Sequence, residues 1–152
     1  MKRSVFIASS SELKHERLEL VDLLMDMNHE LKEQGFKWKS ELWEFMDSSM
    51  QEGRKEDEYL EKLRACEVCI VMFWRTLGEY TVEELDVAVA EMQAGRLPRQ
   101  VYVLFREPDD GISQELLTFR QEFTKNYPTL PLHTFEGDNT LRDLVKNFLT
   151  TV

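Results

Sequence analysis

The sequence predicts an α/β fold in which a parallel sheet of five strands carries helices on both faces. Short apolar runs alternate five times with longer segments whose apolar residues recur at helical spacing. Repeated strand–helix alternation requires right-handed crossovers, which make the strands parallel and distribute the helices over both faces. The 152 residues show no linker, low-complexity tract or internal repeat, so we expect one domain over residues 1–152.

The first half of the chain is expected to supply two strands and two helices. Ser4–Ala8 is short and apolar, as in a strand that is buried on both faces. Glu12–Gln34 carries a helical apolar stripe and stops at Gly35, a residue typical of helix ends. Phe36–Phe45 is rich in aromatic residues and predicts the second strand. Lys55–Ala65 has its apolar residues on one face and predicts the second helix.

The second half continues the alternation. Val68–Trp74 is the most apolar run of the chain and is expected to form the central strand. Thr81–Ala94 predicts a helix closed by Gly95, and Val101–Phe105 predicts the fourth strand. The remaining elements are a helix at Ser113–Phe123, a Pro-marked strand at Leu130–Phe135 and a last helix at Leu141–Leu149. These units most simply give the flavodoxin-like strand order 2-1-3-4-5, with a topological switch point between the first and third strands.

Composition excludes several classes of function. A formal net charge of −10 leaves no basic stripe to displace counterions from phosphates, so nucleic-acid binding is not expected. The same charge disfavours an anionic membrane surface, and no apolar run approaches the roughly 20 residues that span a bilayer. The apolar run at the N-terminus is too short for a signal peptide, so we expect a cytoplasmic protein. Cys66 and Cys69 lack the partners of a metal site, so we expect buried thiols and no metal.

Ligands of open α/β sheets bind beyond the carboxyl ends of the strands, so the loops at the switch point are the first candidates for a site. The loop after the first strand contains Ser9 and Ser10, whose hydroxyl and backbone N–H groups suit a phosphate or pyrophosphate. The alternative is structural, because Ser9 followed by Glu12 matches a capping box that only satisfies the helix end.

The second candidate loop, Trp74–Tyr80, leads into a helix with Glu83 and Glu84 in its expected first turn. Aromatic residues crowd this loop, where polar ones are usual, and Ala88 leaves space one turn beyond Glu84. A cap is again the alternative, because Thr81 followed by Glu84 matches the same capping-box pattern. Spacing alone does not choose between the two carboxylates.

A third loop, after the second strand, contains Asp47 and Arg54, and the guanidinium suits a bidentate phosphate contact. A solvated turn is the alternative interpretation.

Two other classes of protein with this topology are excluded by the residues of the first loop. A response-regulator receiver needs an acidic pair where this chain has Ser9 and Ser10, and a dinucleotide-binding site needs a Gly-rich phosphate loop there.

Several stretches resemble a Toll/interleukin-1 receptor (TIR) domain or its TIR-like relatives, over roughly residues 3–105. They include Val5-Phe-Ile-Ala-Ser-Ser, Phe45-Met-Asp47, Gly53-Arg54-Lys-Glu-Asp57 and Tyr80-x-x-x-Glu84-Leu-Asp-Val-Ala88. The last is similar to the pattern that carries the catalytic glutamate of TIR-domain NAD hydrolases, although many of those have Trp where this chain has Tyr80. The same window also resembles nucleoside deoxyribosyltransferases, which share the sheet topology.

The resemblance implies a TIR-like fold and hydrolysis of the nicotinamide–ribose bond of NAD+, with Glu84 as the catalytic residue and no separate cofactor. Nicotinamide leaves as a neutral molecule, so one carboxylate is enough, in contrast to the pair used by ordinary glycosidases. The remaining expected contacts with the nucleotide are aromatic stacking by Trp74 and Tyr80, pyrophosphate contacts by Ser9, Ser10 and Arg54, and further lining by Asp47 and Thr81.

Two alternatives to NAD hydrolysis follow from the same resemblance. Many TIR domains only assemble with one another, which makes 47–54, the equivalent of the BB loop, a homotypic interface. The second alternative is a deoxyribosyltransferase-like activity on nucleosides. Because TIR domains are usually effectors attached to sensing modules, we expect this chain to be the effector part of a larger defence or cell-death signalling protein.

Overall fold

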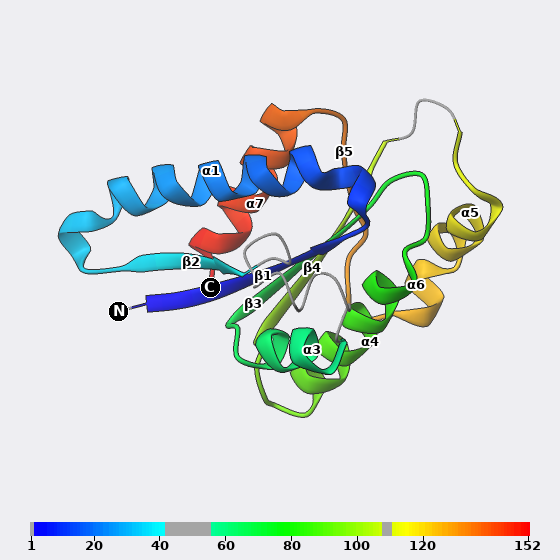
Figure 1. Ribbon diagram of the computed structural model, residues 1–152, viewed down its shortest axis with the longest axis horizontal. Coiled ribbons are helices and arrows are strands. Elements are labelled where there is room, and N and C mark those ends of the chain that lie inside the picture. The colour runs from blue at the N-terminus through cyan, green and yellow to red at the C-terminus, as the bar shows by residue number, and fades with distance from the viewer. Residues whose placement is uncertain (1, 42–55, 108–110) are drawn as a thin grey trace.

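Five parallel strands form one sheet in the order β2-β1-β3-β4-β5, which confirms the predicted topology (Figure 1). The computed structural model describes residues 2–41, 56–107 and 111–152. The strands are β1 (Lys2–Ser9), β2 (Lys37–Glu41), β3 (Val68–Phe73), β4 (Gln100–Arg106) and β5 (His133–Phe135). The central strand β3 is buried along its whole length, as its apolar composition predicts.

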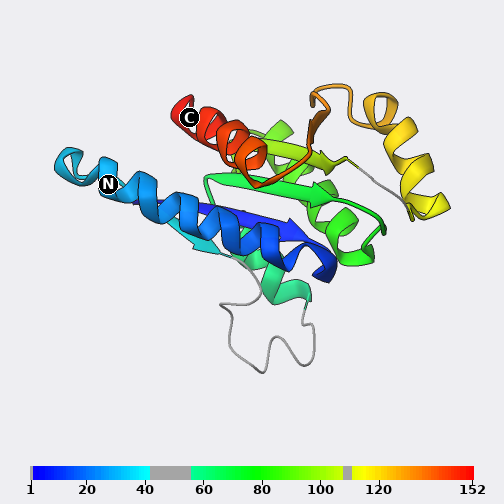
Figure 2. The same cartoon turned by 90° about the horizontal axis from the view of Figure 1, so that it is seen from above.

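Helices cover both faces of the sheet (Figure 2). The helices α1 (Lys14–Glu30) and α7 (Asp138–Thr150) lie on one face, and α3 (Glu56–Arg64) and α4 (Glu79–Gln93) lie on the other (Figure 1). Two short helices, α5 (Gln114–Gln121) and α6 (Phe123–Asn126), follow β4.

The alternation of side chains along each strand divides the core into two clusters. In β3, Val68, Ile70 and Met72 join the cluster that includes Leu20, Leu24 and Val145 from α1 and α7. The intervening residues Cys69, Val71 and Phe73 join the cluster that includes Leu85 and Ala88 from α4. A residue of β3 or of its flanking helices therefore belongs to one face of the sheet or to the other.

The predicted helix stops at two glycines are confirmed. Gly35 and Gly95 have φ angles of 69° and 79°, in the left-handed region that side chains other than glycine rarely adopt. Before Gly35, the predicted helix is a continuous α1 flanked by single 3₁₀ turns at Ser11–Leu13 and Lys32–Gln34.

Other boundaries differ from prediction for local reasons. The helix α4 begins at Glu79, two residues earlier than predicted, because Gly78 takes the N-cap position. The predicted helix Ser113–Phe123 is divided between α5 and α6, and β5 starts only at His133. Pro131 has no N–H to donate, which shortens that strand. The predicted continuation of β2 to Phe45 lies outside the described residues.

In the part of the chain that the structure describes, none of the helices combines the length and apolar composition needed to cross a bilayer. The two thiols are free and buried, as expected. Burial raises the pKa of Cys66 to about 12, so this thiol is protonated and has the character of a core residue.

Candidate active site at the carboxyl edge of the sheet

Glu84 is the carboxylate that the structure turns inward. Its residue is only 4% exposed, whereas Glu83 beside it is exposed to solvent. Burial, and after it the negative charge of Glu84, raise the pKa of the Cys69 thiol in β3 well above its usual range. The carboxylate of Glu84 therefore lies close enough to the central strand to influence a core thiol there.

The capping-box interpretation of Thr81 and Glu84 is wrong. Gly78 is the N-cap of α4, so Thr81 already lies inside the helix and is buried. Glu84 follows within the helix, beyond the backbone N–H groups that an N-terminal cap satisfies. Capping of the helix therefore does not account for its burial.

The loops after β1 and β3 meet, as the switch-point topology predicts. A Cβ atom at Gly78 would lie 2.8 Å from Thr81 Oγ1 and 3.4 Å from Ser10 Cβ. A side chain at this position would require the Thr81 hydroxyl to move, whereas the distance to Ser10 Cβ is an ordinary van der Waals contact. This contact brings Ser10 and Thr81, two predicted site residues from different elements, to one place.

Arg17 lies directly beneath the serine loop. Its Nη1 donates to Ser9 Oγ at 2.5 Å and to the backbone oxygen of Ser10 at 2.7 Å. The Ser9 hydroxyl in turn donates to the Ser10 backbone oxygen. Arg17 is fully buried, so its positive charge is presented at the loop where the sequence predicts an anion.

Glu12 also departs from its predicted role. In a capping box it would return to the backbone of Ser9, but its Oε2 instead accepts hydrogen bonds from Ser10 Oγ and from the backbone N–H and hydroxyl of Thr76. Ser10 is the N-cap of the first 3₁₀ turn and makes no side-chain cap bond. The carboxylate thus joins the loop after β1 to the loop after β3.

Trp74 is already stacked against arginine in this structure. The Cζ atoms of Arg75 and Arg106 each lie 4.0 Å from the centroid of its ring. Arg106 also donates to Glu16 Oε1 at 2.8 Å, and the Glu16 residue is 3% exposed. Trp74 Nε1 and Glu16 Oε2 are both buried and have no hydrogen-bond partner among the described residues.

The other predicted site residues have different surroundings. Tyr80 is 41% exposed at the start of α4, which leaves an aromatic surface open to solvent beside Thr81. Phe73, by contrast, is a core residue, because its ring packs against Phe105 and Phe119. The predictions for Asp47 and Arg54 concern residues outside the described ranges.

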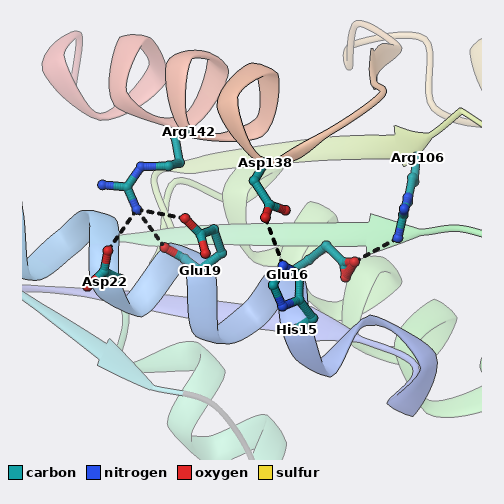
Figure 3. Close-up of polar contacts among 7 residues, drawn as sticks. All are labelled: His15, Glu16, Glu19, Asp22, Arg106, Asp138 and Arg142. Atoms are coloured by element: carbon teal, nitrogen blue, oxygen red, sulfur yellow. Dashed lines mark hydrogen bonds and ion pairs between the residues drawn. The ribbon is translucent and has the colours of Figure 1, made fainter.

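A second polar group joins α1 to α7 on one face of the sheet (Figure 3). His15 Nε2 lies 2.8 Å from Asp138 Oδ2, and Arg142 forms an ion pair with Glu19 at 3.1 Å. Potential metal ligands of His15, Glu19 and Asp138 lie within 4.8 Å of one another. Because ion pairs account for each of these side chains, we assign the group to the packing of the two helices.

Three charged residues at the carboxyl edge were not predicted from the sequence, namely Glu16, Arg17 and Arg106. A signal existed for Arg106, which directly follows the predicted fourth strand at its carboxyl end. Glu16 and Arg17 lie inside a helical segment where charged residues are usually solvated, so sequence spacing gave no sign of their burial.

The site and the sheet define an α/β protein with a carboxylate and several arginines near the switch point. No protein-family model matches the sequence, and a comparison with curated proteins finds no relative. Membership of the TIR family therefore stays a prediction.

Two solved structures have a similar architecture. A CMP N-glycosidase from Clostridium botulinum, BcmB, shares 16% identity with this chain, at a TM-score of 0.53 over 96% of this chain and 99% of that one. A de novo designed Rossmann 2x3 fold protein shares 16% identity, at a TM-score of 0.47 over 99% of this chain and 91% of that one. At this identity the first likeness establishes the fold alone.

Proposed function

We propose that this chain hydrolyses the N-glycosidic bond of a nucleotide, with Glu84 as the carboxylate that acts at the ribose. The observation that carries the proposal is the burial of Glu84 inside α4, where it neither caps the helix nor faces solvent. Burying a carboxylate costs free energy of desolvation, and buried ionisable groups concentrate at functional sites.

Two likenesses support the class of bond. The sequence window around Glu84 resembles NAD hydrolases and nucleoside deoxyribosyltransferases, and one solved structure of similar fold is named a CMP N-glycosidase. The three names share an N-glycosidic bond between a sugar carbon and a base nitrogen. Fold likeness alone does not assign an activity, so these proteins select the substrates to be tested first.

The chemistry requires one negative charge near the sugar. The bond from C1′ to the base nitrogen breaks with its electron pair leaving on the base, and the oxygen of water then bonds to C1′. Glu84 would stabilise the oxocarbenium-like transition state or orient the ribose hydroxyls. A cytosine leaving group takes up the proton released from water, whereas nicotinamide leaves NAD+ as a neutral molecule and the proton from water passes to the solvent.

The surroundings of Glu84 suggest how a nucleotide would be held. The serine loop above the buried positive charge of Arg17 is suited to a phosphate oxygen through that charge and the backbone N–H groups, because the Ser9 and Ser10 hydroxyls already donate to the Ser10 backbone oxygen and to Glu12. Tyr80 offers a partly exposed aromatic ring for a base. Trp74 is a weaker candidate for stacking than the sequence predicts, because Arg75 and Arg106 already lie over its ring.

The test is release of free base from CMP, cytidine and NAD+, separated chromatographically, across a range of protein concentrations. We expect turnover of at least one nucleotide and a loss of at least about 100-fold in Glu84→Gln. Glu83→Gln is the matched control, because Glu83 is the neighbouring but exposed carboxylate, and it should retain wild-type activity. Equal activity in wild type and Glu84→Gln would remove Glu84 from the mechanism.

The alternatives predict different results. Turnover of NAD+ but not of CMP favours the NAD hydrolase predicted from the TIR resemblance. Transfer of the sugar of an added 2′-deoxynucleoside to a second free base favours a transferase. Self-association without turnover of any substrate would favour the homotypic interaction module and contradict the enzymatic proposal.

A further inference from the structure

We infer that Glu12 is a positioning residue for the proposed reaction, and the inference rests on that proposed function. Glu12 makes no predicted contact with a nucleotide. Its Oε2 accepts from Ser10 Oγ at 2.8 Å, from Thr76 N at 3.0 Å and from Thr76 Oγ1 at 2.6 Å. One carboxylate oxygen thus holds the loop after β1 and the loop after β3 together.

These bonds connect parts of the chain that are far apart in sequence. Glu12 and Thr76 are separated by 64 positions, so neither loop can form the contact alone. Hydrogen bonds to an ionised carboxylate are shorter and stronger than those between neutral groups. The Thr76 backbone N–H and hydroxyl donate to the same oxygen, which fixes this residue in both position and orientation.

The loop that Glu12 holds leads directly into the helix of Glu84. Two residues after Thr76, Gly78 caps α4 and packs against Ser10 and Thr81, where a side chain would displace the Thr81 hydroxyl. The backbone oxygen of Arg75, the residue before Thr76, accepts a hydrogen bond from the Ser113 backbone N–H at 2.8 Å. The loop after β3 is therefore held by two contacts. Glu12 binds it at Thr76, and Ser113, just before α5, binds it at Arg75.

The proposed role predicts a separation between stability and catalysis. Thr76 is exposed, so water can replace the acceptor that a Glu12 variant loses, and the net cost to the free energy of unfolding should be small. In contrast, a displacement of about 1 Å at a reacting group lowers the rate by about 100-fold. Loss of Glu12 should therefore affect turnover much more strongly than folding.

The experiment compares Glu12→Ala, Glu12→Gln and Thr76→Val with the exposed first-turn acid Glu115→Ala as the control. Turnover of the best substrate, KM, the thermal midpoint and hydrogen exchange of the Thr76 amide are measured for each. We expect Glu12→Ala to lower kcat by about 10- to 100-fold. The thermal midpoint should change by less than about 4 °C. Any rise in KM should be smaller than the fall in kcat, because Ser10 is the one proposed phosphate contact whose hydrogen bond to Glu12 is lost.

The remaining variants test the hydrogen bonds themselves. Glu12→Gln keeps an acceptor oxygen and should restore most of the kcat, whereas Thr76→Val removes one donor and should lie between the two Glu12 variants. Exchange of the Thr76 amide should accelerate at least about tenfold in Glu12→Ala and be unchanged in Glu115→Ala. If Glu12→Ala does not fold, the kcat values of the other two variants are compared with that of wild type. The inference then requires Thr76→Val to have a lower kcat than Glu12→Gln, and an equal or higher value contradicts it.

The outcomes distinguish this inference from the function on which it rests. Wild-type protein that is inactive on every nucleotide overturns both. Active wild-type protein with an unchanged kcat in Glu12→Ala overturns only the role of Glu12, whether or not amide exchange accelerates. A fall in kcat that Glu12→Gln fails to restore would also contradict positioning through these hydrogen bonds.

Discussion

Arg106 at the end of β4 donates from Nη1 to Glu16 Oε1 in the first turn of α1, over a distance of 2.8 Å (Figure 3). The pair spans 90 positions of the sequence and lies at the carboxyl edge of the sheet. Glu16 is buried, so the guanidinium is the group that compensates its charge there. The same guanidinium lies over the ring of Trp74.

Arg106→Met should therefore lower the free energy of unfolding by about 3 kcal/mol. The methionine retains an apolar stem against Trp74 but leaves the Glu16 carboxylate buried without its counter-charge. Arg99→Met is the control, because Arg99 also forms an ion pair, with Glu67 at 3.0 Å, but is 64% exposed. Its cost should stay below about 1 kcal/mol in urea unfolding.

The double variant Glu16→Gln/Arg106→Met checks the cause. A neutral glutamine side chain in place of Glu16 needs no counter-charge, so the double variant should be more stable than Arg106→Met alone. Equal stability of the two variants would show that the loss arises from packing against Trp74 and not from the isolated carboxylate.

The contact between His15 and Asp138 predicts a small dependence of stability on pH. The hydrogen bond to Asp138, and then the negative charge of Asp138, raise the pKa of His15 above 6.5. A pKa that is raised on folding gives a contribution that is complete below the unfolded value and is lost as pH rises through the folded value. The stabilisation should therefore be present at pH 5.5 and absent at pH 9.

The difference in unfolding free energy between wild type and His15→Gln measures this effect. It should be larger at pH 5.5 than at pH 9, yet stay below about 1 kcal/mol, because the two side chains are 66% and 44% exposed. High salt should reduce the difference further. A difference that grows with rising pH would contradict the assigned partner.

The residue pattern was sufficient to predict the sheet but not the polar contacts at its edge. The alternation along β3 follows from burial on both faces, and each face requires apolar residues in every second position. Glu16 and Arg17 are charged residues of α1 that lie buried. Their partners, Arg106 for Glu16 and Ser9 for Arg17, belong to other elements. Spacing within a helix carries no information about partners on other elements.

The two capping-box interpretations failed for different physical reasons. Glu12 accepts hydrogen bonds from Thr76 across the switch point, a tertiary contact that a local pattern does not predict. In α4 the reason is local, because Gly78 takes the N-cap position ahead of Thr81. The prediction of Glu84 as the inward carboxylate came only from the family resemblance, because Glu83 fits the spacing equally well.

Gly78→Ala tests the close approach of the two loops. The added Cβ would lie 2.8 Å from Thr81 Oγ1, while φ of −71° is ordinary for alanine, so the expected cost is steric. Gly137→Ala is a matched control, because Gly137 is the N-cap of α7 and has nothing within 4 Å of its added Cβ. Both substitutions replace an N-cap glycine, so any loss of capping free energy applies equally to the two variants.

We expect Gly78→Ala to cost about 1–3 kcal/mol more than Gly137→Ala in the free energy of unfolding. Thr81→Ala removes the atom that clashes, so the double variant Gly78→Ala/Thr81→Ala should lose less than the sum of its single changes. Full additivity in this double-mutant cycle would place the strain elsewhere than between Gly78 and Thr81.

Tyr80 provides the sharpest test of how a substrate base would be held. The residue is 41% exposed at the start of α4 and belongs to neither core cluster, so Tyr80→Ala should lower the thermal midpoint by no more than about 4 °C. Stacking of a base on an aromatic ring contributes about 1–3 kcal/mol, which corresponds to a rise in KM of about 5- to 150-fold in Tyr80→Ala. Tyr80→Phe keeps the ring and should retain the wild-type KM. Leu117→Ala, at a similar exposure of 37% on α5, should also leave KM unchanged. If Tyr80→Ala binds the nucleotide as well as wild type does, the base is held by another surface.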